Sequence, residues 1–331
     1  MNKFKYYFIL LITTVSFFSC SKNNTDTTVE PLRDYAVQYA ADNTDIEEYL
    51  KTNYITVTNH AGFVDDQDVT YTKITNAATQ PSIYSYLNSA TYPKLLSRDV
   101  SLHDIVYKLY YLILRPGVGQ SPCNVDGVLA AYHGEYLTRV AATTTAAAYL
   151  TSTLFEETKF PQTFFGLNTT ITGWSEIFPQ FKTGTYTSNA DGTVTHTDFG
   201  AGVMFLPSGL GYYNTTSGSI PSYSPLVFSF KLFEIQRLDT DGDGILNYQE
   251  DVNGDNYMRT LSTGVINPDD TDSDGIPNFL DTDDDGDNYA TKLEIKNPAT
   301  GLAFPFADIP NCSGNTTDPA RIKKYLDKNC H

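Results

Sequence analysis

The most constraining feature of the sequence is an acidic stretch from Asp239 to Glu294, which carries 16 acidic and 2 basic residues. Its net charge of −14 accounts for most of the −17 of the 331-residue chain. Such a stretch repels itself unless cations neutralise it. The rest of the chain is nearly neutral, and the 24 tyrosines and 19 phenylalanines are enough to build a core. The sequence therefore predicts a folded domain joined to a cation-dependent segment, and it excludes a nucleic-acid binder, which needs a basic face.

The acids of this stretch recur in frames that suit calcium. Oxygen-bearing side chains alternate with other residues, and glycine stands at the sixth position of the first two frames. Ca²⁺ takes about six to eight oxygen ligands, and glycine permits the sharp turn between them. The expected ligands are Asp239, Asp241, Asp243, Asn247 and Glu250 in a first loop, Asp270, Asp272, Asp274, Asn278 and Asp281 in a second, and Asp283, Asp285, Asp287 and Glu294 in a third.

The first loop has the spacing of an EF-hand loop, in which Glu250 can bind with both oxygens. Flanking helices have no room between residues 267 and 288, where Pro277 would break one. The repetition therefore resembles thrombospondin type 3 repeats, which wrap a chain around calcium ions. We expect structural calcium, which would make the segment a rigid spacer or an adhesive extension. The alternative is a solvated acidic linker.

The first twenty residues indicate export. Two lysines precede an apolar run at residues 6–18, which is shorter than the roughly 20 residues of a permanent membrane helix. The run closes on Cys20, and a polar tether, residues 21–30, follows. This arrangement resembles a bacterial lipobox with Cys20 as the lipidation site; the alternative is cleavage by an ordinary signal peptidase. We expect a lipid-anchored protein of the bacterial cell envelope, at the outer membrane, facing the periplasm or the surface.

Cysteine usage agrees with export. Cys312 and Cys330 lie near the C-terminus, and an oxidising compartment favours a disulfide between them. Cys123 is then the odd thiol, which we interpret as an inert buried side chain. The sequence has no CxxC pair and its five histidines are scattered, so it predicts no zinc site.

The mature chain divides into an N-terminal part, a strand-rich domain, the acidic loops and a tail. In the strand-rich domain, residues 138–152 and 185–200 resemble loop insertions. A short helix is predicted where Trp174 begins an apolar stripe at helical spacing, and Pro179 should end it near Phe178. The expected boundaries are 31–105 for a helical and irregular region, 106–235 for the strand-rich domain, 236–296 for the calcium loops and 297–331 for the disulfide-closed tail.

Five blocks of the strand-rich domain carry the resemblance to a known family, at residues 128–134, 154–158, 170–174, 206–212 and 219–228. In this order and spacing they resemble FKBP-type prolyl isomerases. The resemblance implies an α+β fold, a curled antiparallel sheet around one short helix, flanked here by an N-terminal helical region and a calcium-loop extension. With the signal and the acidic loops, the whole chain resembles FKBP-type lipoproteins of Bacteroidota.

The resemblance also implies a site, an apolar cleft for the substrate proline with Trp174 as its floor. Glu156 stands where the family has Asp, and the backbone N–H of Thr170 would donate to the substrate. Phe164 or Phe165 would fill one further aromatic place. The alternative is that these aromatics are ordinary core. The implied catalytic residues are Tyr132, Phe155, Glu156, Ile171, Trp174, Tyr212 and Phe228, with substrate contacts from Thr170, Phe164, Phe165 and Ile220.

The implied reaction is rotation of an X–Pro amide, which needs no nucleophile and no cofactor for catalysis. An apolar cleft favours the twisted amide, because twisting removes the resonance that separates charge. The expected substrates are proline-containing exported polypeptides. Two alternatives remain open. One is a chaperone that holds proline-containing segments without turnover, and the other is a calcium-dependent surface or adhesion lipoprotein.

Overall fold

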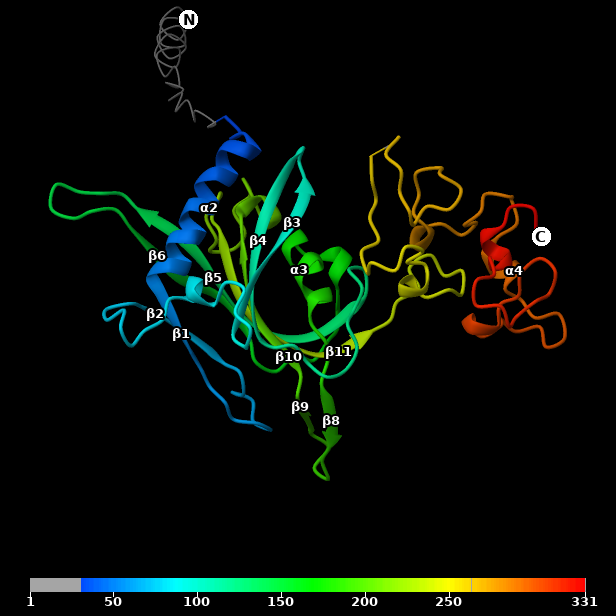
Figure 1. The fold of residues 1–331 in the computed structure, drawn as a ribbon, viewed down its shortest axis with the longest axis horizontal. Helices are drawn as coiled ribbons and strands as arrows, with labels where there is room; N and C mark the ends of the chain where they lie inside the picture. The colour runs from blue at the N-terminus through cyan, green and yellow to red at the C-terminus, as the bar shows by residue number, and fades with distance from the viewer. Residues whose placement is uncertain (1–30, 263, 331) are drawn as a thin grey trace, which may run out of the picture. The chain divides into compact units, whose positions relative to one another are not determined.

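The computed structural model describes residues 31–262 and 264–330. The expected signal peptide (residues 1–20), the lipidation site Cys20 and the tether (residues 21–30) lie outside these residues. From Asp34 onward the chain forms one compact unit, in which a strand-rich body leads into loops with short helical turns (Figure 1). Within the described ranges, no helix combines the length and the apolar character that crossing a membrane requires.

The body is built on one antiparallel sheet with the strand order β3-β4-β10-β11-β5-β6, and β7 pairs with β5. The sheet curls around the short helix α3 (Thr172–Ile177), as Figure 1 shows. The expected α+β class is confirmed. The strands are β3 (Lys94–Leu102), β4 (Ile105–Arg115), β5 (Gly127–Val140), β6 (Tyr149–Thr158), β7 (Phe165–Gly166), β10 (Gly200–Leu206) and β11 (Leu226–Gln236).

The central strands bury both faces of the sheet. On β4, Leu109 and Tyr111 join the core that contains α3, whereas Tyr110 and Leu112 join the core on the other face. Successive side chains of a strand point to opposite faces, so one strand serves both cores. Burial on both faces explains why these strands read as nearly continuous apolar runs.

The N-terminal part covers the face of the sheet opposite α3. Helix α2 (Tyr35–Thr52) begins after Asp34, whose carboxylate accepts the first backbone N–H groups, and it packs through Ile46 and Leu50. A hairpin and a 3₁₀ turn connect α2 to β3. They are β1 (Asn53–Val57), β2 (Val69–Lys73) and η1 (Ile83–Tyr86).

The two predicted insertions are hairpins rather than loops. Strands β5 and β6 extend into residues 138–152, so that only residues 141–148 form the tip. Their β-branched threonines favour strand over loop. Residues 185–200 form a small hairpin of β8 (Thr185–Ser188) and β9 (Val194–Thr197) before the chain enters β10.

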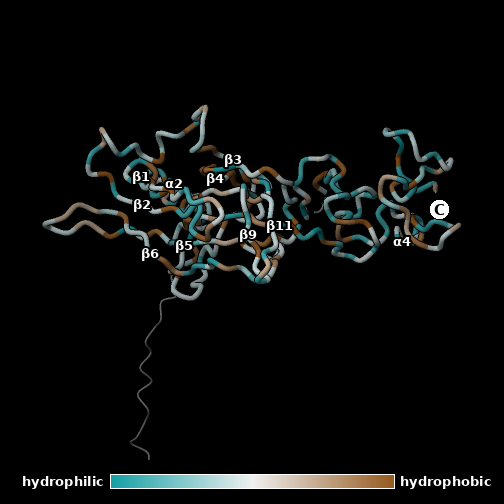
Figure 2. The backbone as a smooth tube through the Cα atoms, turned by 90° about the horizontal axis from the view of Figure 1, so that it is seen from below, coloured by the Kyte–Doolittle hydropathy of each residue, from teal (hydrophilic) through white to brown (hydrophobic). Residues whose placement is uncertain are grey.

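Beyond β11 the chain forms acidic loops with isolated 3₁₀ turns and the one-turn helix α4 (Thr291–Glu294). In Figure 2 hydrophilic stretches alternate with short hydrophobic ones along these loops. The apolar residues have a small core of their own, which joins the first loop, the end of α4 and the tail. That core contains Ile245, Ile295, Ile309 and Tyr325.

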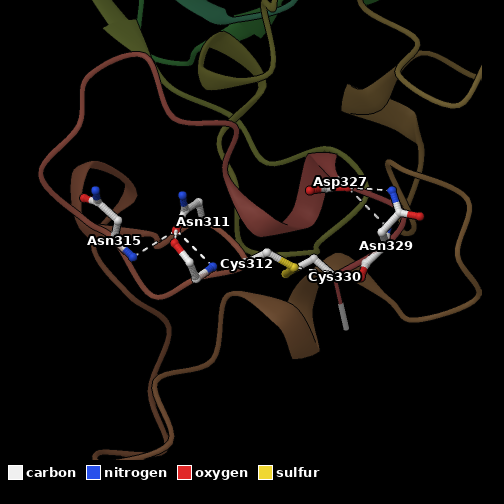
Figure 3. The surroundings of a disulfide bond; sticks show 7 residues. Asn311, Cys312, Asn315, Asp327, Asn329 and Cys330 are labelled. Atoms are coloured by element: carbon white, nitrogen blue, oxygen red, sulfur yellow. Dashed lines mark hydrogen bonds between the residues drawn. A yellow bond between two sulfur atoms is a disulfide. The ribbon is translucent and has the colours of Figure 1, made fainter.

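The three cysteines in the described part of the chain occupy the predicted states. Cys312 and Cys330 form a disulfide with a Cα–Cα distance of 5.3 Å, which closes the tail (Figure 3). Asn311 and Asp327 beside the two cysteines accept hydrogen bonds from nearby backbone N–H groups, which hold the flanking turns. Cys123 is free and fully buried, and burial raises the pKa of its thiol. A thiol held protonated in this way is inert.

Candidate functional site

Trp174 lies at the centre of a group of aromatic rings on the face of the sheet that holds α3. Its ring centroid is 5.0 Å from that of Tyr132, 5.1 Å from that of Phe228 and 5.2 Å from that of Phe165, each edge to face. Ring quadrupoles favour this geometry. Trp174 is 5% exposed, and no residue in the described part of the chain accepts a hydrogen bond from its indole Nε1. The group is therefore a packed aromatic floor that contains one donor.

The position of Trp174 follows from the local sequence. Ile171 is extended and caps α3, which places Trp174 in the first turn. Gly173 lets α3 approach β10, because a Cβ there would lie 2.5 Å from a leucine side chain of that strand. Pro179 then ends α3 as predicted, and the chain continues as a 3₁₀ turn (Phe178–Gln180).

Half-buried side chains form the edge of the floor. Phe155 of β6 contacts Phe228 of β11 edge to face, with 5.5 Å between centroids. Gly134 of β5 makes room for both rings, because a Cβ there would lie 2.6 Å from Phe155 and 2.7 Å from Phe228. Ile171 and Tyr212 pack against the same core and stay partly exposed. Aromatic and aliphatic surface next to Trp174 is thus accessible to solvent.

Most residues assigned to the proline site from the sequence meet in the structure. Phe165 takes the remaining aromatic place, whereas Phe164 is 40% exposed and lines a separate pocket of about 750 Å³. Thr170 directs its backbone N–H and its hydroxyl to the carbonyl of Leu167, at 3.4 and 2.9 Å, so this N–H is engaged within its own turn. The residues that meet are Tyr132, Phe155, Ile171, Trp174, Tyr212, Ile220 and Phe228.

Glu156 lies on β6 at the exposed edge of this group, paired in register with Gly134. It neighbours the hydroxyl of Tyr132. Burial raises the pKa of Tyr132, and the carboxylate of Glu156 adds to the rise. Tyr132 therefore keeps its proton and can donate a hydrogen bond at the edge of the aromatic floor.

A set of contacts that the sequence did not indicate holds α3 to the acidic loops. Glu176 of α3 is 2% exposed and accepts hydrogen bonds from Arg98 at 2.8 Å and from Arg259 at 2.6 and 3.2 Å. Tyr257 donates its hydroxyl to the backbone carbonyl of Glu176 at 2.8 Å, and the Arg98 guanidinium lies over the Tyr257 ring. These partners are about 80 positions from Glu176, beyond the reach of any spacing rule. Glu176 stands two residues after Trp174, so the anchor adjoins the aromatic floor.

In the acidic loops, one group of carboxylates is almost completely buried. Asp241, Asp243 and Glu250 of the first loop meet Asp284 of the third, with oxygens within 4.8 Å of one another. At least one oxygen of each accepts no hydrogen bond from any described residue. Burial, the larger cause, and repulsion by the neighbouring acids, the smaller one, raise the pKa of Glu250 to about 10 and the pKa of Asp284 to about 9. The sequence frames indicated Asp241, Asp243 and Glu250, and they did not indicate Asp284.

Two further groups follow the sequence frames more closely. Glu294 adjoins the group of the third loop. It is 1% exposed, and neither of its carboxylate oxygens has a hydrogen-bond donor among the residues described. Burial and then Asp285 raise the pKa of Glu294 to about 8. Asp281 accepts a hydrogen bond from the backbone N–H of Asp283 at 2.9 Å. The groups are Asp270, Asp272 and Asp274, and Asp283, Asp285 and Asp287.

Other expected ligands close the loops through hydrogen bonds. The amide of Asn247 accepts from the backbone N–H of Thr240 at 2.9 Å and donates to its hydroxyl at 2.8 Å. Asn278 makes the same pair of bonds to Thr271, both at 2.9 Å. The carboxylate of Asp239 accepts two backbone N–H groups of its own loop, at 2.8 and 3.2 Å. These side chains give the loops their shape.

The three carboxylate groups fit a hard divalent cation. They contain only Asp and Glu, and oxygen is the ligand that Ca²⁺ takes, about six to eight at a time. Buried carboxylates without donors are costly unless a positive charge compensates them. The first group meets this description most fully, because three of its four side chains are 1–2% exposed.

Residues 240–319 match the family model described as BamM C-terminal, which spans less than half of the chain. None of the curated proteins matches. Among solved structures, a peptidyl-prolyl cis-trans isomerase from Pseudomonas syringae pv. tomato shares 19% identity over 45% of this chain and 86% of its own, with a TM-score of 0.29.

Two further solved structures are similar over shorter parts of their length. FkpA from Escherichia coli shares 24% identity over 39% of this chain and 48% of its own, with a TM-score of 0.28. The three FKBP domains of wheat FKBP73 share 14% identity over 43% of this chain and 50% of their own, with a TM-score of 0.29. This chain thus spans about half the length of these two. At such identities, and with TM-scores below 0.5, the likeness assigns no activity to this chain.

Proposed function

We propose that this protein is a peptidyl-prolyl cis-trans isomerase of the FKBP type that assists the folding of exported, proline-containing polypeptides. The observation that carries the proposal is the set of rings around Trp174, with the half-buried Phe155, Ile171 and Tyr212 at its edge. A proline ring has no N–H and is apolar, so a surface of this kind can bind it without polar partners.

The chemistry consists of rotating an amide. The X–Pro bond prefers to be planar, with a barrier of about 18–20 kcal/mol. The twisted state has lost resonance and separates less charge, so an apolar surface disfavours it less than the planar state. The rings would bind the proline, while the hydroxyl of Tyr132 at their edge would donate to the substrate backbone. Contacts that are stronger in the twisted state accelerate exchange.

Cis/trans exchange of an Ala-Leu-Pro-Phe peptide, measured by NMR in millimolar calcium, tests this activity. The wild-type protein should accelerate exchange. Tyr212→Ala should lose most of the acceleration, because it removes one edge of the aromatic surface. Phe164→Ala is the matched control, since it removes an aromatic ring outside the group, and it should retain the activity. A folded wild-type protein that leaves exchange unchanged would refute the catalytic proposal.

A second function, polypeptide binding without turnover, is favoured by a separate observation. Exposed aromatic side chains gather around the pocket of about 750 Å³: Phe63 is 60% exposed, Phe160 69% and Phe164 40%. Exposed apolar patches are typical of protein interaction sites. A chaperone of this kind would suppress the aggregation of an unfolded client, and Phe160→Ala would weaken the suppression. Suppression by a protein that does not accelerate peptide exchange would favour this second function.

We propose that calcium is the structural cation of residues 236–296. The support is the oxygen-only composition of the three carboxylate groups and the burial of the first. Isothermal titration calorimetry with calcium, and with magnesium as the control, tests the proposal. Binding at millimolar calcium or below is expected. A folded protein that shows no binding in that range would refute it.

We also propose a lipid anchor at Cys20 and a place in the cell envelope. The match of residues 240–319 to the BamM C-terminal model supports an outer-membrane-associated location. Cys20→Ser should move the protein from the membrane fraction to the soluble fraction, and unchanged fractionation would contradict the anchor. Protease added to intact cells separates a surface protein, as calcium-dependent adhesion would require, from a periplasm-facing one.

A further inference from the structure

We propose that the cation site of the first acidic loop is shared between two loops, with Asp284 of the third loop as its fourth carboxylate ligand. The proposal rests on the calcium part of the proposed function and deepens it. A single-loop frame predicts ligands from Asp239 to Glu250 alone. The structure instead places Asp284 with Asp241, Asp243 and Glu250, all with oxygens within 4.8 Å of one another.

The position of Asp284 within its own loop explains why its side chain is free to reach the first loop. Thr240 and Thr271 hold the equivalent second position of the other loops, and each hydroxyl accepts a hydrogen bond from the asparagine seven residues later. In the third loop the residue types differ, while the side chain seven residues later still accepts the backbone N–H of the second position. Thr291 stands at the asparagine position, and its hydroxyl accepts the backbone N–H of Asp284 at 3.2 Å. The third loop thus closes without the Asp284 carboxylate.

Burial and charge show that the shared group needs a cation. Glu250 and Asp284 are each 1% exposed, and none of their four carboxylate oxygens has a hydrogen-bond donor among the residues described. Lys292, a base near the group, donates to the carbonyl of Gly242 at 3.2 Å, and its single charge cannot balance four carboxylates. Four carboxylates offer enough oxygens for the roughly six to eight ligands of Ca²⁺.

A cation at this site would tie together segments that are distant in the chain. It would join residues 239–250 to residues 283–294, next to the small core of Ile245, Ile295, Ile309 and Tyr325. That core reaches the disulfide-closed tail through Tyr325. Loading the site would therefore order the first loop, the third loop and the tail together, which three independent loops would not do.

Calcium titration of the full chain and of Asp284→Asn tests the proposal, with binding measured by calorimetry and protection by limited proteolysis. The variant should bind calcium at one site about tenfold or more weaker, as expected for the loss of a charged ligand. It should also lose calcium-dependent protection within residues 239–250, a loop that it does not alter. Asp308→Asn removes an equal charge from an exposed position and is the matched control. It should behave as the wild type.

Two further variants keep the test valid if Asp284→Asn folds poorly. Asp284→Thr restores the residue type of the other two loops, and Glu250→Gln removes a ligand from the opposite side of the site. Each should weaken the same site and leave the affinity of the other sites unchanged. Wild-type affinity at every site in Asp284→Thr would overturn the shared site while leaving calcium binding intact. A wild-type chain that binds no calcium would overturn both proposals.

Discussion

Removing calcium should make the stability of the acidic loops decrease as the pH rises. In the cation-free fold, burial and then neighbouring acids raise the pKa of Glu250 to about 10 and that of Asp284 to about 9. In the unfolded chain these carboxyls return to ordinary values of 4.5 and 3.8. Between the two values the folded state holds more protons than the unfolded state. The free energy of unfolding therefore decreases with rising pH throughout this window.

The cost at neutral pH is large. At pH 7, holding each carboxyl protonated costs about 1.4 kcal/mol for each pH unit above its unfolded pKa. With unfolded pKa values of 3.8 and 4.5, this is about 4 kcal/mol for Asp284 and about 3 kcal/mol for Glu250. The two costs together approach the entire stability of a typical protein, about 5–15 kcal/mol. We expect the cation-free loops to be folded at about pH 4.5 and unfolded at about pH 8.

Cleavage by a calcium-independent protease, mapped by mass spectrometry, measures this opening. In EDTA, cleavage within residues 239–294 should increase between these two pH values. In millimolar calcium it should decrease over the same range, because calcium binds the deprotonated ligands. Cleavage at the hairpin tip, residues 141–148, reports on the protease itself. Cation-free loops that are protected equally at both pH values would show that the buried carboxylates do not carry the cost, and would refute the reasoning.

The strand-rich body allows three other tests. Glu176→Gln should lower the free energy of unfolding by about 2 kcal/mol and the melting temperature by about 4–8 °C. The control Lys159→Gln, at an exposed ion pair, should lower the free energy of unfolding by no more than about 0.5 kcal/mol. Equal effects of the two variants would contradict a buried anchor. Gly134→Ala should cost about 1–3 kcal/mol in thermal unfolding, because its Cβ would meet Phe155 at 2.6 Å; an unchanged melting temperature would show that the ring moves aside. Cys123 should react with a thiol reagent only after denaturant is added, and fast reaction in the folded protein would contradict its burial.

Local patterns were sufficient to predict the elements that carry the site. The helical spacing after Trp174 and the stop at Pro179 predicted α3, because both act within two turns of chain. Asp270, Asp272 and Asp274 lie together, as do Asp283, Asp285 and Asp287, for the same reason, since carboxylates two residues apart in a loop are neighbours in space. The Thr- and Ala-rich composition of residues 138–152 predicts a loop insertion, yet both of its ends pair as strand and only residues 141–148 form the tip.

The sequence by itself determined which side chains form the candidate sites: an aromatic set in one domain, carboxylates in another, and cysteines that pair in the tail. Only the tertiary structure decided which distant members meet. Asp284 reaches Glu250, and Glu176 reaches Arg259, because loops separated along the chain pack together. Phe165 rather than Phe164 faces Trp174, since a shift of one residue along a strand turns a side chain to the opposite face. Periodicity describes one element at a time, whereas these contacts depend on how the sheet curls and where the loops dock.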